Sequence, residues 1–167
     1  MGFKKSSDVL VISNSVTESA PATFTELQVN LPLDPLNNEV FVVLGIDIDL
    51  SNPENIPTVT TSVNGAITVT SQTAMLGIGN PRCLARATKA IQQGAGTVDG
   101  AAFTSNEGNT PNAMLDYIGI IATDDFFISV EAGNGTVVRS AAVRVWGYRA
   151  RADASTYAAL VQSELLS

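Results

Sequence analysis

EVFVVLGIDIDL, residues 39–50, is the stretch that decides the fold. Its even-numbered positions are all apolar, while its odd-numbered positions change from Phe41 and Val43 to Asp47 and Asp49. Because the side chains of a β-strand alternate between two faces, this pattern predicts a long strand with one face buried along its whole length. We expect the other face to be covered near Phe41 and to reach solvent at the two aspartates. Such a strand is typical of the core of a β-sandwich.

Other apolar or alternating stretches are separated by glycine, proline and asparagine, which favour turns. Asn64–Gly65 is the dipeptide that best suits a two-residue hairpin turn, so it predicts a hairpin with arms at 58–63 and 66–71. Further strands are predicted at residues 8–13, 22–31, 113–122, 126–132 and 136–150.

The middle of the chain is harder to interpret. Residues 81–93 fit a helix and a strand equally well, because the small and apolar positions satisfy both periods. Residues 94–112 are rich in Gly, Asn, Thr and Ser and predict a surface loop, with a short strand at 101–104. A loop of this length is usually functional or contacts a neighbour.

The end of the chain changes from strand to helix. Asp153 or Ser155 can cap a helix whose apolar residues recur at helical spacing, and we expect it to pack on the sandwich or on a neighbouring copy. The whole chain therefore predicts an all-β fold, a two-sheet antiparallel sandwich of jelly-roll type with a short C-terminal helix. We divide it into an N-terminal extension (1–20), the sandwich (21–152) and the helical tail (153–167).

The composition limits the partners. The chain of 167 residues is 45% apolar, only 15% charged, and has a net charge of −7. This charge argues against strong nucleic-acid binding, which needs clustered Lys and Arg. No apolar run approaches the roughly 20 residues of a membrane-spanning helix, so no membrane span is predicted. A single cysteine, Cys83, allows no intrachain disulfide.

The residue types needed for catalysis are largely missing. The sequence has no histidine, which removes Ser-His-Asp and Cys-His arrangements and most zinc sites. We therefore predict no enzyme activity and no catalytic residues. Asp47 and Asp49 share a strand face and are near enough to bind one divalent ion such as calcium. The alternative is a solvated strand end that discourages edge pairing, and no other cofactor is predicted.

Aromatic residues near the end of the chain suggest a contact surface. Trp146 and Tyr148 lie between arginines on the predicted strand 136–150, a pattern that suits a sheet rim or a subunit contact. Our candidate subunit-interface residues are Trp146, Tyr148, Arg149, Tyr157 and Leu160.

Two stretches carry a resemblance: FTELQVNLPLDPLNNEVFVVLGIDIDL (24–50) and AAVRVWGYRARADASTYAALVQSELL (141–166). With the size and expected strands of the chain, they resemble single jelly-roll viral capsid proteins, in particular the small major capsid proteins of tailless bacterial or archaeal viruses. The resemblance is one of architecture and not of a short motif. Many capsid proteins of small single-stranded viruses have a long basic arm, whereas only Lys4–Lys5 stand here.

The resemblance implies a structural protein, made in the host cytoplasm and located in the virion capsid. Its partners would be copies of itself in a symmetric assembly, with or without a second coat protein. Two alternatives stay open. One is a decoration or spike protein of a phage or virus. The other is a carbohydrate-binding sandwich, with Trp146, Tyr148 and Tyr117 as a sugar platform and calcium held by Asp47 and Asp49.

Overall fold

A computed structural model describes residues 3–94, 100–106 and 116–166. Its strands form two five-stranded sheets. Sheet A contains β1 (Lys4–Lys5), β2 (Leu10–Thr17), β4 (Glu39–Leu50), β8 (Gly119–Ile121) and β10 (Ser140–Arg151). Sheet B contains β3 (Thr25–Asn30), β5 (Thr61–Thr68), β6 (Cys83–Gln93), β7 (Gly100–Asn106) and β9 (Asp125–Gly133). A short 3₁₀ helix, η1 (Pro35–Asn37), precedes β4, and α1 (Ala154–Leu166) follows β10.

The strand order defines the fold. Sheet A runs β2-β10-β4-β8, with β1 continuing along the β2 side of β10, and sheet B runs β3-β9-β5-β6-β7. All strand pairs are antiparallel. Strands β2 to β5 alternate between the sheets, and β8 to β10 return beside them in reverse order. Strands connected in this way form two interleaved Greek keys, which is the arrangement of a jelly roll. The predicted fold class is therefore confirmed.

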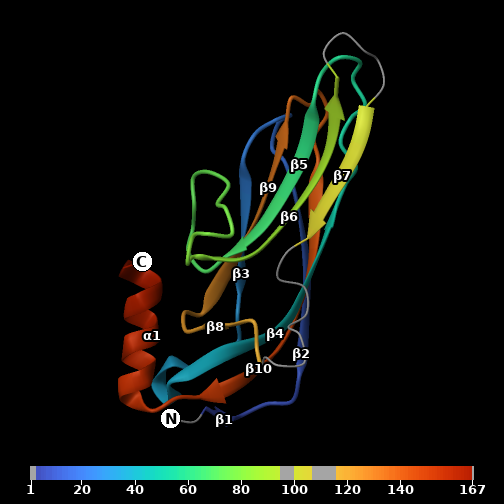
Figure 1. Cartoon of the computed structure of the whole chain (residues 1–167). Coiled ribbons are helices and arrows are strands. Elements are labelled where there is room, and N and C mark those ends of the chain that lie inside the picture. Colours follow the sequence, from blue (N-terminus) through green and yellow to red (C-terminus); the bar gives the residue numbers. More distant parts are fainter. Residues whose placement is uncertain (1–2, 95–99, 107–115, 167) are drawn as a thin grey trace.

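The core lies between the two sheets of an elongated sandwich (Figure 1). Its largest fully buried side chains are aromatic or β-branched, as expected for residues that pack well on a pleated surface. They include Phe41, Ile46, Val63, Ile67, Ile121, Phe126, Ile128, Val130 and Val145.

β4 has the predicted bounds, but its alternation is interrupted. Trp146 of β10 lies opposite Gly45, whereas the next residue, Gly147, lies opposite Val43. Leu44 is therefore an extra residue in β4, a β-bulge that has no counterpart in β10.

Before the bulge the odd-numbered side chains of β4 face the interior of the sandwich, and after it the even-numbered ones do. The prediction of one uninterrupted apolar face was therefore wrong. Ile46 faces the interior of the sandwich, as do Phe41 and Val43 on the other side of the bulge. Val40 and Val42 belong to a second apolar cluster, beneath α1 on the outside of sheet A. Because both faces are apolar at the start of β4, the sequence period could not reveal the change.

The predicted hairpin at Asn64–Gly65 was also wrong. Both residues lie inside β5, which is paired with β6 on one side and β9 on the other. The glycine is needed for close packing and not for a turn: a Cβ at Gly65 would lie 2.7 Å from Leu50 Cδ2 of the opposite sheet. The Asn64 side chain faces outward, where its Oδ1 accepts a hydrogen bond from Thr88 Oγ1 at 2.9 Å.

The middle of the chain is resolved in favour of strands. Residues 83–93 form β6, so the strand alternative for 81–93 is confirmed over the helix. β7 contains the predicted short strand at 101–104, while the rest of the predicted loop at 95–99 and 107–112 lies outside the described residues. The predicted strand at 113–122 is shorter: β8 covers only Gly119–Ile121, and residues 113–115 are not described.

α1 confirms the predicted C-terminal helix and its cap. The Asp153 carboxylate accepts a hydrogen bond from the Thr156 N–H at 2.8 Å, as an N-cap residue does. The helix packs on its own sandwich: Tyr157, Leu160 and Val161 contact the outer apolar cluster of sheet A. Figure 1 shows α1 standing beside the end of the sandwich that holds β1 and β8.

Candidate functional site

Several of the candidate residues lie on the outer face of sheet A, in the part that α1 does not cover. The register of β2, β10 and β4 places side chains there in three rows that cross the sheet. The rows are Val11–Trp146–Gly45, Ser13–Arg144–Asp47 and Ser15–Ala142–Asp49, which together we call the outer-face site.

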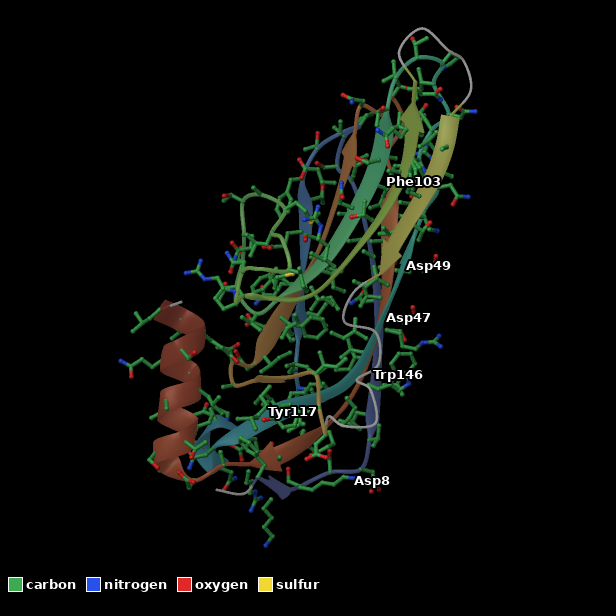
Figure 2. All side chains as sticks on the ribbon, in the orientation of Figure 1. Asp8, Asp47, Asp49, Phe103, Tyr117 and Trp146 are labelled. Atoms are coloured by element: carbon green, nitrogen blue, oxygen red, sulfur yellow. The ribbon has the colours of Figure 1, made fainter. Side chains whose placement is uncertain are left out.

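The outer-face site includes a shallow polar hollow with a volume of about 570 Å³. Figure 2 shows Asp49, Asp47 and Trp146 following one another along the same side of the sheet. The predicted sharing of one strand face by the two aspartates is therefore confirmed. The hollow is lined by Ser13, Asn14, Ser15, Asp47, Asp49, Ala142, Val143 and Arg144.

Cations lie beside both carboxylates. Arg144 is directly opposite Asp47 in the strand register, and its Nε donates to Ser13 Oγ at 3.4 Å. The same guanidinium lies 5.9 Å from the centroid of the Trp146 ring, within cation–π range. Lys89 Nζ approaches Asp49 at 3.8 Å, although this aspartate side chain is 84% exposed. An exposed pair of this kind contributes little to stability.

These residues offer a poor fit to calcium. Calcium takes six to eight oxygen ligands, whereas the hollow supplies two carboxylates and a few neutral side-chain oxygens, with the positively charged guanidinium of Arg144 beside them. Within the described residues there is no group of three or more His, Cys, Asp or Glu side chains that could hold a metal ion. The hollow is suited to a neutral or zwitterionic polar partner, because it presents hydroxyls and charges of both signs.

Most of the candidate interface residues make contacts within the chain. Tyr148, Tyr157 and Leu160 pack in the cluster under α1, and Lys5 Nζ lies 5.1 Å from the centroid of the Tyr148 ring. Of these candidates Trp146 lies in the outer-face site, where it is half-buried.

Arg149, the remaining candidate, also binds within the chain. Its Nη1 lies 3.6 Å from Glu39 Oε2 and donates to Pro32 O at 3.2 Å. Contacts of all these candidates with another subunit stay a prediction.

The three aromatics of the carbohydrate alternative do not form one platform. Tyr117 shortly precedes β8, and the next residue, Ile118, donates its N–H to Val43 O of β4. Because β8 and β10 pair with opposite edges of β4, Tyr117 lies on the far side of β4 from Trp146 and Tyr148. Tyr148 is covered by α1 and Lys5, which leaves Trp146 alone on the open face.

Buried glutamates are a feature that the sequence analysis missed. Glu18 is 4% exposed, and its carboxylate accepts hydrogen bonds from the N–H groups of Ala132 at 2.7 Å, Arg139 at 2.8 Å and Thr23 at 3.1 Å. It therefore joins the end of β2 to β9 and β10. A carboxylate that replaces water at several backbone donors stabilises the loops that carry them.

Glu164 joins α1 to the sandwich in the same way. Its carboxylate accepts hydrogen bonds from the Ala122 N–H at 2.7 Å and from the Thr123 N–H and hydroxyl, both at 3.0 Å. Burial raises the pKa of Glu164, and these hydrogen bonds act in the opposite direction. A signal was present in the sequence, because Glu164 is the only charged residue of α1.

Glu54 plays the corresponding role at the other end of the sandwich. It accepts hydrogen bonds from the Thr136 hydroxyl at 2.8 Å and the Val137 N–H at 3.2 Å, and lies 3.9 Å from Arg139. Hydrogen bonds from the Thr136 backbone and side chain hold the pKa of Glu54 below its usual range. Glu18, Glu164 and Glu54 thus use their carboxylates in contacts within the chain.

No family model matches the sequence, and no curated protein matches it. A chain from the solved structure of Desmodium yellow mottle tymovirus is similar, with 10% identity and a TM-score of 0.31 over 89% of this chain and 91% of that one. At this level of similarity, the strand order remains the evidence for the fold. Among the described residues, no helix has the length and apolarity needed to cross a membrane.

Proposed function

We propose that this chain is a structural subunit of a virus shell, which acts by assembling with copies of itself and catalyses no reaction. The observation that carries the proposal is a jelly roll whose interior is filled by its own side chains. Phe41, Phe126 and Ile128 are each at most 1% exposed between the sheets. A jelly roll that bound or transformed a small molecule inside the sandwich would need space there.

The surface supports assembly as the function. Large apolar side chains are exposed at several separate places, on both sheets and on the helix. They include Val11 (55%), Phe103 (56%), Val137 (51%), Leu165 (61%) and Leu166 (74%). Burial of such residues against neighbouring copies would supply the favourable free energy of a closed symmetric shell.

The composition of the surface agrees with the proposal. Lys4, Lys5 and Arg151 come together where β1 pairs with the end of β10, and they are the one place where several exposed cations meet among the described strands. A site of this size does not condense a genome, which favours a shell in which other components package the nucleic acid. The proposed location is the virion, after synthesis in the cytoplasm of a bacterial or archaeal host.

Electron microscopy of the purified chain tests this function. We expect closed particles or discrete rings of uniform diameter when the concentration is raised. A population that stays monomeric at every concentration, with or without a second coat protein from the same genome, would contradict the proposal.

The outer-face site favours a second candidate function, that of a carbohydrate-binding β-sandwich. Its hollow combines hydroxyls, carboxylates and Arg144 next to Trp146, and this mixture suits the hydroxyl groups and apolar face of a sugar. A glycan array probed with the wild type and with Trp146→Ala tests it. Binding that is lost in the variant would support this candidate, and absence of binding by the wild type would exclude it.

A further inference from the structure

Among the described strands, β2 has the least protected free edge. β2 pairs with β10 over all of its residues, from Leu10 to Thr17, without a register shift. No other described strand pairs with its opposite side. Between Asp8 and Glu18 the sequence has no charged residue and no proline, which are the usual devices that prevent a sheet edge from pairing.

The other sheet edges differ from β2. β8 is only three residues long. β3 carries Glu26, whose carboxylate accepts hydrogen bonds from the Ser71 hydroxyl at 2.6 Å and the Gln72 N–H at 2.8 Å, so the segment after β5 lies beside this strand. β7 lacks charge, but both of its ends continue into residues outside the described part of the chain. β2 therefore combines length, regular pairing and absence of charge.

The hydrogen-bonding groups on the free side of β2 can be assigned from the ladder. Glu18 N–H donates to Arg139 O, and in an antiparallel pair every second residue bonds to the same partner. The even-numbered residues of β2 therefore direct their backbone N–H and C=O groups toward β10, as Glu18 does. Val11, Ser13 and Thr17 direct their N–H and C=O groups outward. Ser15 has the same outward orientation, and its N–H donates a local hydrogen bond to Asn14 Oδ1 at 2.9 Å.

From this geometry we infer that β2 pairs with β2 of a second copy of this chain, antiparallel across a twofold axis near Ser13 and Asn14. The inference deepens the proposed function and rests on it only for the identity of the partner. A strand edge selects another strand, because its unpaired backbone groups need partners along a line. An antiparallel pair around a twofold axis is self-complementary, as a symmetric dimer requires.

Charge favours a second copy at this edge. Copies with a net charge of −7 repel one another, so a contact between them is most favourable where the charge is absent. The exposed Val11 side chain, together with Val9 at 48% exposure, adds apolar area at the same edge. Pairing would join two copies of sheet A into one continuous sheet.

Disulfide trapping tests the pairing in the full chain. Opposed residues near the axis would have Cα atoms about 4.5–5.5 Å apart, which a disulfide can span. We expect Ser13→Cys or Asn14→Cys to give a covalent dimer on mild oxidation. Ala142→Cys is the matched control: it is exposed in the same outer-face site but one strand further from the axis, so it should give no dimer. The wild type, whose only cysteine is the buried Cys83, should give none either.

A second variant tests the same edge without new covalent bonds. Ser13→Pro removes an outward N–H that β10 does not use, and proline is tolerated on edge strands. We expect a variant with native circular dichroism that has lost its twofold contact, measured as a shift from dimer or larger assembly to smaller species in sedimentation velocity.

The possible outcomes separate the two proposals. If the wild type assembles, but neither cysteine variant forms a dimer and Ser13→Pro assembles normally, the β2 pairing is wrong while the shell function stands. If the wild type remains monomeric under all conditions, both are overturned. Covalent dimers from Ser13→Cys or Asn14→Cys, with loss of association in Ser13→Pro, would support the pairing.

Discussion

The Phe41 ring occupies the space that a side chain at Gly147 would need: a Cβ at residue 147 would lie 2.5 Å from Phe41 Cε1. The same Cβ would lie 2.5 Å from the backbone oxygen of Val42. The bulge at Leu44 places this contact, because it turns Phe41 into the sandwich next to Gly147 of the paired strand β10. The exchange of faces in β4 therefore depends on a glycine in the neighbouring strand.

Replacement of this glycine should destabilise the fold. In Gly147→Ala the new methyl group must displace a buried ring and a backbone carbonyl, and overpacking of this kind costs about 1–3 kcal/mol or more. Urea denaturation measures the loss. Gly79→Ala is the matched control, since a Cβ there meets nothing within 4 Å. Equal stability of the two variants would contradict the position of Phe41.

The alternation of buried and exposed side chains in β4 after the bulge gives a second prediction. Ile46 is 1% exposed, whereas its neighbour Asp47 is exposed in the outer-face site. Ile46→Asp places an unpaired charge in the core, which costs several kcal/mol, and should abolish soluble, assembled protein. Asp47→Asn should leave the protein soluble and folded. Native-like assemblies of Ile46→Asp, seen by size-exclusion chromatography, would refute the strand assignment.

The third prediction concerns the attachment of α1. Glu164→Ala leaves the buried Ala122 N–H without an acceptor, at a cost of about 1–3 kcal/mol. Hydrogen exchange should accelerate at Ala122 and through α1 before the rest of the sandwich opens. Gln162→Ala, an exposed change on the same helix, should leave the exchange rates unchanged. Unaltered protection of Ala122 in the glutamate variant would argue against this attachment.

The helix cap gives a prediction about pH. Hydrogen bonds from Ser155 and Thr156 lower the pKa of Asp153 from 3.8 to about 2. A carboxylate whose pKa is lower in the folded state than in the unfolded state stabilises the fold when the pH is above its unfolded pKa. For Asp153 this contribution is lost as the pH falls from 3.8 through about 2. Amide exchange at Thr156 should therefore increase over this range.

Two variants separate the cap from general acid effects. Asp153→Ser retains an acceptor for the Thr156 N–H and should keep its protection, independent of pH. Asp153→Ala should lose the protection at neutral pH already. A titration midpoint of Asp153 near 3.8, measured by NMR, would show that the cap bonds are absent in solution.

The sequence predicted the fold class, the bounds of β4 and the capped helix, because each depends on local pattern. It failed where tertiary contacts override that pattern. Asn64–Gly65 has the chemistry of a turn, yet Gly65 serves the close approach of Leu50 from the other sheet. The bulge at Leu44 was hidden because α1 covers the start of β4.

The candidate site was predicted in part. The shared face of Asp47 and Asp49 followed from the strand period, but their cationic neighbours depend on which strands are adjacent, and sequence order does not give that. The buried glutamates bond to backbone groups up to 121 residues away, as Glu18 does to Arg139, so no local spacing could indicate them.

The native mass of the purified chain, by light scattering after size exclusion with and without a calcium chelator, tests the central claim most directly. We predict discrete oligomers or large closed particles whose mass does not change on chelation. A stable monomer would contradict the shell function. A monomer that also loses stability when the chelator is added would favour a calcium-dependent binding module.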